Sequence, residues 1–263
     1  MAFERTSEQV FLNVSALLFA LSAALTTIWC KSMSDMGAMP MPGGWKMSMA
    51  WMRMPGQSWV EAASSFLAMW IVMMVAMMMP SLVPALWRYR KVVGRTGETR
   101  LAWLTMLAGL GYFFVWTVIG VAVFAVGVAL AGMEMESPAL ARTVPVAAGV
   151  VVLIAGTLQF TTWKTHHLAC WRKTPGHDDT LPPNAGTAWR HGLRLGFRCS
   201  YGCADLTAVL LAIGIMDLKA MVAVTVAISA ERLAPASERV ARATGAVVVG
   251  TGLLLIARAA GLG

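Results

Sequence analysis

Residues 70–81 read WIVMMVAMMMPS, and this stretch decides what kind of fold the chain can adopt. It contains no charged residue, and six of the eleven residues from Met69 to Met79 are methionine. The apolar run around it covers about residues 59–86, which is long enough to cross the hydrocarbon core of a bilayer as a helix. The stretch therefore predicts a membrane-spanning helix that is rich in thioether sulfur.

The whole chain has the composition of an integral membrane protein. Hydrophobic residues make up 58% of its 263 residues and charged residues only 13%, whereas soluble domains carry about 25% charged residues. The net charge of +8 would suggest nucleic acid in a soluble chain, but the basic residues fall in short connections between apolar runs. No phosphate loop, dinucleotide fingerprint or basic-aromatic module is present, so nucleic acid is not an expected partner.

Seven apolar runs predict an all-α fold, a polytopic transmembrane helical bundle in one domain over residues 1–263. Six spans are the alternative, because the sixth run is short and ends in Glu231 and Arg232. The runs lie at about 10–30, 59–86, 101–131, 144–163, 196–216, 218–233 and 243–262.

Lysine and arginine are distributed so as to favour a cytoplasmic amino terminus. With that orientation, 15 of the 21 basic residues fall in the inside segments, as the positive-inside rule requires. The first apolar run lacks a small-residue cleavage site, so a cleaved signal peptide is not expected. The cysteines fall on both predicted sides of the membrane, with Cys30 apart from the other three, and a disulfide framework is therefore not expected.

A predicted outside loop, residues 31–58, is dense in methionine, glycine and proline. Thioethers are soft ligands that favour Cu(I), so the loop predicts capture of a soft metal ion outside the membrane. The alternative is that these methionines are adaptable surface filler. The candidate ligands are Met33, Met36, Met39, Met41, Met47, Met49, Met52 and Met54.

Within residues 59–86, Met69, Met73 and Met77 recur every four residues and share one helix face, about 6 Å apart along the axis. Met74 and Met78 form a neighbouring row with the same period. Such a ladder could pass Cu(I) along the helix or hold it at one level. Methionines in membrane helices also pack against neighbours without binding anything.

A predicted cytoplasmic loop, residues 164–195, contains all four histidines, His166, His167, His177 and His191. His166 and Cys170 lie four residues apart, which places them on one face if a helix continues through this region. Both residue types bind zinc, copper and iron. The alternative is that the histidines are solvated or face lipid headgroups, and His177 and His191 are the weaker candidates.

The last part of the chain adds a pair of cysteines and two acidic residues. Cys199 and Cys203 share a helix face at the four-residue interval and could bind a metal together, or be inert small residues. Asp205 and the earlier Gln159 are polar residues within apolar runs, where a carboxylate must be paired or wet. Glu231 is a candidate carboxylate ligand, or else a helix-end partner of Arg232.

The predicted topology places these features at one depth. The methionine-rich end of the second span, Gln159 and His166, the pair Cys199 and Cys203, and Glu231 all fall in the half of the membrane nearer the cytoplasm. This coincidence favours an intramembrane metal site over four unrelated features.

Four stretches in order, WIVMMVAMMMPS, GTLQFTTWKTHHLAC, GFRCSYGC and ISAER, resemble the spaced signatures of domain-of-unknown-function family 2182, described as predicted metal-binding integral membrane proteins. The resemblance covers about residues 59–233 and implies a polytopic protein of the bacterial inner membrane with a metal site. Gly202 stands where this family often has a cysteine, which implies a weaker and more exchangeable site. The residues to which the resemblance points are Met73, Met77, Met78, Pro80, Gln159, Lys164, Cys170, Cys199, Cys203 and Glu231.

Together these observations favour an inner-membrane protein that captures Cu(I), or another soft or borderline metal, and holds or relays it at a Met/Cys site. The alternative is a copper- or other metal-dependent membrane oxidoreductase, or a subunit of a membrane oxygenase system, with Cys199, Cys203, His166 and Glu231 as ligands. A third alternative is a scaffold whose methionines only pack. The expected partners are membrane lipid, the metal ion, and other membrane subunits or metal donors.

Overall fold

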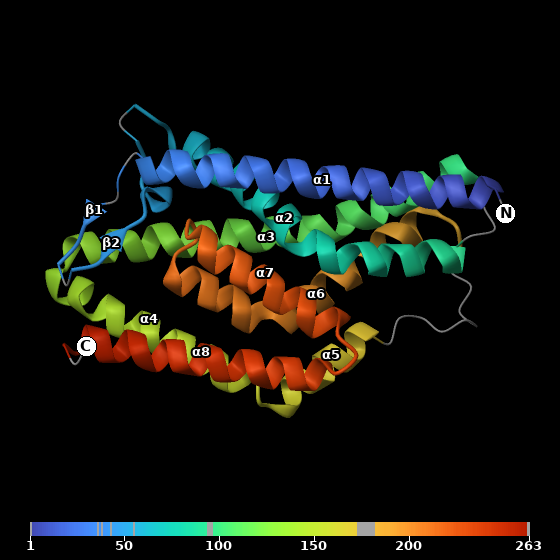
Figure 1. Ribbon diagram of the computed structural model, residues 1–263. Coiled ribbons are helices and arrows are strands. Elements are labelled where there is room, and N and C mark those ends of the chain that lie inside the picture. The colour runs from blue at the N-terminus through green and yellow to red at the C-terminus, as the bar shows by residue number, and fades with distance from the viewer. Residues whose placement is uncertain are drawn as a thin grey trace.

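Eight α-helices and a short hairpin make up the described part of the chain (Figure 1). The computed structural model describes residues 2–35, 37, 39–42, 44–54, 56–93, 97–172 and 182–261, apart from the side chains of residues 2–6, 34, 35, 170 and 172. The elements are α1 (Ala2–Asp35), β1 (Met39–Pro40), β2 (Lys46–Met47), the 3₁₀ turn η1 (Met49–Trp51), α2 (Trp59–Val93), α3 (Glu98–Glu136), α4 (Pro138–Leu158), α5 (Thr162–Arg172), α6 (Ala185–Ile213), α7 (Leu218–Leu233) and α8 (Ser237–Ala259). The predicted helical bundle is confirmed.

Six of the described helices, α1, α2, α3, α4, α6 and α8, are long and apolar enough to cross a membrane. The helix α7 has 16 residues, fewer than the roughly 20 that a span needs. By length and composition six described helices therefore qualify as spans, the alternative given by the sequence, although α7 carries the chain back along the bundle between α6 and α8 (Figure 1). The fold is consistent with a multi-pass membrane protein.

Successive long helices run in opposite directions along the bundle (Figure 1). The segment between α1 and α2 lies at one end, here called the loop end, and the amino terminus lies at the other, here called the N-terminal end (Figure 1). The helices α2, α4 and α7 run from the loop end to the N-terminal end, whereas α1, α3, α6 and α8 run back.

The helix α2 forms the centre of the bundle. Half of its most apolar window is buried, compared with 17% for α1 and α3. The indole of Trp70 donates a hydrogen bond to the backbone oxygen of Trp116 at 2.8 Å, which anchors α2 against α3. The helix continues past Pro80 and Pro84 to Val93, so Pro80 does not end it.

Glycines allow two pairs of helices to approach closely. A side chain at Gly192 on α6 would collide with the backbone of Ala108 on α3, and one at Gly111 on α3 would lie 2.8 Å from the Trp189 oxygen. On α4 and α8, Gly149 and Gly252 meet in the same way. Small residues at such crossings let helix backbones pack without intervening side chains, as is common in membrane bundles.

The methionine-rich segment at the loop end is irregular, as predicted. It contains the hairpin, in which β1 and β2 pair antiparallel with Met39 opposite Met47. The indole of Trp45 donates to the backbone oxygen of Ala141 at 2.8 Å and so ties the hairpin to α4. This segment is therefore held against the bundle at a defined place.

Much of the predicted loop 164–195 is helical. The helix α5 covers Thr162–Arg172, and α6 begins at Ala185, where the side chain of Asn184 accepts a hydrogen bond from the Thr187 amide at 2.7 Å. The sequence reading missed this because α5 is too polar and too short to be recognised as a span. Residues 173–181, which include His177, lie outside the described residues.

We expect Gly192→Val to destabilise the bundle, because the added side chain has no room at the α3–α6 crossing. Overpacking of this kind costs about 1–3 kcal/mol. The measurement is the unfolding midpoint of the purified protein in detergent. The control is Gly109→Val on α3, where an added Cβ meets nothing within 4 Å; equal midpoints for the two variants would contradict the packing.

Candidate metal centre

Two helices bring cysteine and methionine sulfur together in the core. The sulfur atoms of Cys199 on α6 and Met78 on α2 lie 3.8 Å apart, and both side chains are buried. With metal–sulfur bonds of about 2.3 Å, two sulfurs that share one ion lie no more than about 4.6 Å apart. The pair therefore has a separation that one shared metal ion can bridge.

Cys199 also receives two polar side chains from other helices. The guanidinium of Arg232 on α7 donates to the Cys199 sulfur at 3.1 Å and to the Cys199 backbone oxygen at 3.1 Å. The hydroxyl of Tyr112 on α3 lies 2.8 Å from the same sulfur. Thiolate is the form of cysteine that binds metals, and Arg232 places a positive charge beside that atom.

The rest of the Arg232 side chain is also held. It donates to the hydroxyl of Ser81 on α2 at 3.0 Å, and its guanidinium lies over the ring of Trp171 on α5, 4.3 Å from the ring centroid. Both Arg232 and Trp171 are buried. One guanidinium therefore contacts α2, α5 and α6 from its place on α7.

Cys203 lies one turn beyond Cys199 on the same helix face, as the four-residue spacing predicted. Its thiol donates to the backbone oxygen of Cys199 at 3.0 Å, and the hydroxyl of Thr207 donates to its sulfur at 3.9 Å. Cys199 and Cys203 are free thiols. Both thiols therefore lie on the face of α6 that is buried in the core.

A second buried cluster lies beside the sulfur atoms. The ammonium of Lys164 on α5 lies 2.9 Å from the carboxylate of Glu231 and 3.0 Å from that of Asp205, and it donates to the backbone oxygen of Gly202 at 2.9 Å. The amide nitrogen of Gln159 donates to Glu231 at 3.0 Å. The cluster joins the end of α4 and the helices α5, α6 and α7.

Glu231 and Arg232 do not form the helix-end pair that was one sequence expectation. Although they are neighbours on α7, Glu231 contacts Lys164, whereas Arg232 contacts Cys199. Consecutive residues on a helix point about 100° apart, which directs the two charges to different clusters.

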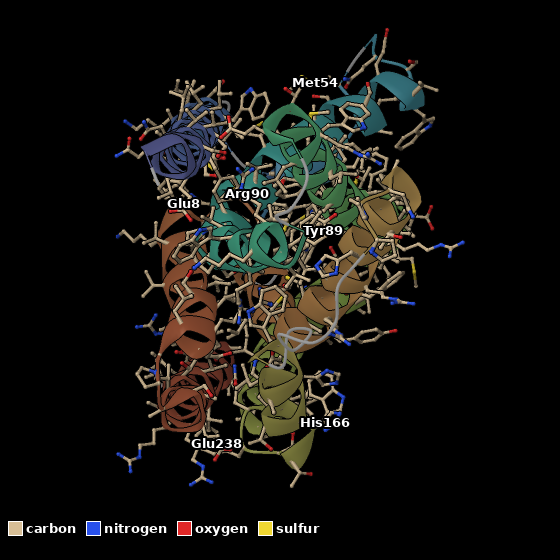
Figure 2. All side chains as sticks on the ribbon, turned by 90° about the vertical axis from the view of Figure 1, so that its right-hand side faces the viewer. Glu8, Met54, Tyr89, Arg90, His166 and Glu238 are labelled. Carbon is tan, nitrogen blue, oxygen red and sulfur yellow. The ribbon has the colours of Figure 1, made fainter. Side chains whose placement is uncertain are left out.

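The described histidines are exposed or half-buried, on α5 and α6. His166 is exposed on α5 at the margin of the bundle (Figure 2), beside His167. Burial lowers the pKa of His167 below its ordinary value, and His166 and Lys164 lower it further. His191 stacks on Tyr89 with ring centroids 4.8 Å apart. The backbone of Cys170 belongs to α5, but its side chain lies outside the description.

The described residues contain no group of three or more His, Cys, Asp or Glu side chains that could hold a metal ion. A metal site in the described core would therefore depend on thioether sulfur in addition to the cysteines. The buried methionines of α2 supply it, because they join Cys199 and Cys203 in one contiguous core. These methionines are Met69, Met73, Met74, Met77, Met78 and Met79.

A cavity of about 360 Å³ lies at the loop end, between α1, the methionine-rich segment and the start of α2. Five methionines from these three segments line it: Met33, Met49, Met52, Met54 and Met69. Of the other loop methionines, Met39 and Met41 lie in or next to the hairpin and Met47 is buried. Met36 lies outside the described residues.

Sequence reasoning missed several residues that surround Cys199. Tyr112, Ser81 and Trp171 gave no signal, since each is an ordinary residue of an apolar or mixed stretch. Arg232 did give a signal in the sequence, because a cation at the end of an apolar run needs a buried partner. Its partner, a cysteine 33 positions away, could not be identified without the fold.

The bundle and its buried sulfur define a class: a helical protein with membrane-span-capable helices and a core that presents soft ligands. Comparison with known families is consistent with this class. The chain belongs to the PpoB2 family, described as copper chaperones, whose family model matches residues 67–255. No curated protein and no solved structure matches the chain. The family supports a copper-related role, in agreement with the expectation of copper, while the family 2182 name stays an expectation.

We expect Lys164→Met to destabilise the protein strongly, because it leaves the Asp205 and Glu231 carboxylates buried without their cation. Breaking a buried ion pair from one side costs about 3–5 kcal/mol. The unfolding midpoint in detergent measures the loss, and Lys219→Met, at an exposed lysine of the same bundle, is the control. A midpoint for Lys164→Met that equals the control would show that the two carboxylates do not depend on Lys164.

Proposed function

We propose that the chain is a copper chaperone of the bacterial inner membrane that binds Cu(I) as its cargo at Cys199 and Met78, with Cys203 as a further sulfur ligand. The observation that carries the proposal is the pair of buried sulfur atoms 3.8 Å apart in a member of a copper chaperone family. Thiolate and thioether are soft donors that select Cu(I) over hard cations. The methionine ladder of α2 then serves as one wall of a copper site.

The buried charges around the cysteines support a monovalent ion. Within the described part of the chain, the charged side chains buried there are two cations, Lys164 and Arg232, and two anions, Asp205 and Glu231. These four groups balance one another. With Cys203 kept as a neutral thiol, as its hydrogen bond to the Cys199 oxygen requires, a Cys199 thiolate adds one negative charge. One Cu(I) ion would neutralise that charge, whereas a divalent ion would leave an uncompensated charge in an apolar core.

The small number of strong donors suits a chaperone. A chaperone must release its ion, so its site should be selective without being closed by four strong ligands. Cys199 and Cys203 supply two thiols, and Gly202, which lies between them in sequence, adds no third. The thioether of Met78 is a neutral ligand that completes the site without further anionic charge.

The methionine-rich segment at the loop end supplies the ion in this proposal. We place the amino terminus in the cytoplasm on the basis of the lysine and arginine distribution, which puts the loop end outside. Thioethers keep their lone pairs at any pH and can capture Cu(I) there. Lipid surrounds the six long helices, and metal donors or other membrane subunits are the remaining partners.

Cys199→Ser should remove the tightly bound copper, because serine offers no soft donor. The measurement is the copper-to-protein ratio, and the Kd from competition with a Cu(I) chelator, for protein purified and loaded without oxygen. The control is Cys30→Ser, which changes a buried cysteine on another helix, α1. If Cys199→Ser holds as much copper at the same Kd as wild type, the proposed site is wrong.

Met78→Leu keeps the packing volume and removes only the thioether. We expect Kd for Cu(I) to rise by about tenfold or more, the range seen when groups that support a metal site are lost. Met106→Leu is the matched control, since Met106 is an exposed methionine on α3. Equal affinities of the two variants would mean that Met78 only packs.

A further inference from the structure

The cavity at the loop end has a lining suited to a soft monovalent cation. Its described lining consists of five methionines together with Trp29, Ser32, Ser65, Gln57, Phe66 and three alanines, and it includes no charged side chain. Without an anionic ligand, the cavity offers little to a hard or divalent ion, whereas several thioethers can bind Cu(I). A water molecule occupies about 30 Å³ in the liquid, so 360 Å³ leaves room for an ion among these side chains.

The cavity connects to the buried site through sulfur. Met69 lines the cavity and belongs to α2, and Met73 and Met77 follow on the same helix face, each about 6 Å further along. Met78 belongs to the neighbouring row with Met74, and its sulfur lies 3.8 Å from that of Cys199. Met73, Met77 and Met78 are at most 3% exposed, so a route along them is shielded from water and lipid.

Nearer the N-terminal end than Cys199, α2 supplies no further sulfur ligands, and a buried positive charge lies there instead. After Met79, the remaining α2 residues 80–93 contain no sulfur. Ser81, three residues beyond Met78 and so about 4.5 Å nearer the N-terminal end, is bonded to the Arg232 guanidinium, which stacks on Trp171. A fixed cation in a narrow path is an electrostatic barrier to another cation.

We propose that the cavity lined by Met33, Met49, Met52, Met54 and Met69 is a second Cu(I) site, and that the buried site both loads and unloads through it. Copper then enters and leaves at the loop end only, and the protein hands copper over on one side of the membrane without transporting it across. This inference rests on the proposed function, because it requires a Cu(I) site at Cys199.

The first test follows the loading of the buried site. Purified protein is mixed with Ag(I), a redox-stable substitute for Cu(I), and the rate and final stoichiometry of binding are measured. The variant Met49→Leu/Met52→Leu/Met54→Leu should lack one class of Ag(I)-binding site. It should also load the buried site about 10- to 100-fold more slowly, because the local Ag(I) concentration that the cavity site provides is lost. The occupancy of the buried site at equilibrium should be unchanged.

The matched control is Met133→Leu/Met135→Leu, which alters two exposed methionines near the loop end of α3 that do not line the cavity. It should behave as wild type. If the cavity variant loads as fast as this control, the inference is overturned, while the proposed function stands as long as Cys199→Ser still loses the ion. If Cys199→Ser keeps the ion, the proposed function itself has failed.

The second test addresses sidedness in sealed vesicles of neutral lipid. The fraction of molecules with the loop end outward is measured by labelling Lys46→Cys, a change in the exposed part of the hairpin, with a membrane-impermeant maleimide. External Ag(I) held by an impermeant chelator should load only that fraction, and no Ag(I) should accumulate in the lumen. Loading of the whole population, or accumulation in the lumen, would show passage across the bundle and overturn the inference.

Discussion

The guanidinium of Arg232 is the constraint on which the arrangement of this core depends. A charged group in an apolar bundle must be paired or it is too costly to bury, and Arg232 is paired on every side that is described. It bonds Ser81 on α2 and Cys199 on α6, and it stacks on Trp171 of α5. Four helices are thereby held in one register around a single sulfur atom.

Lys164 makes a comparable demand on the other side of α6. Its ammonium is fully buried between Asp205 and Glu231, so α5 must pack under the bundle even though it is too short and polar to be a span. The two cations therefore explain why a polar 11-residue helix belongs to the core. They also fix α7, which contributes an anion to one cluster and the cation to the other.

The methionines of α2 have two roles that can be separated physically. As packing residues they fill a central helix, and leucine would do so nearly as well. Packing does not require the order of these methionines along the helix. They extend from the cavity at the loop end to the level of Cys199, and beyond that level the Arg232 guanidinium is the next group. The proposed function would account for this order, since a soft ion needs consecutive soft ligands and a fixed cation opposes its further passage.

The sequence by itself determined the helical class, the approximate positions of the spans and the residue types of the site. Hydrophobicity and period are local properties, so the long runs, the methionine faces and the pair Cys199 and Cys203 could be recognised without a structure. It left the number of spans between six and seven because α7 is apolar but short, and it took α5 for a loop because polarity there hides a helix. Only the tertiary structure decided which groups meet. Contacts such as Cys199 with Met78, Tyr112 and Arg232 join residues that are 33 to 121 positions apart, and such pairings follow from helix rotation and crossing, which glycine contacts and buried charges set jointly.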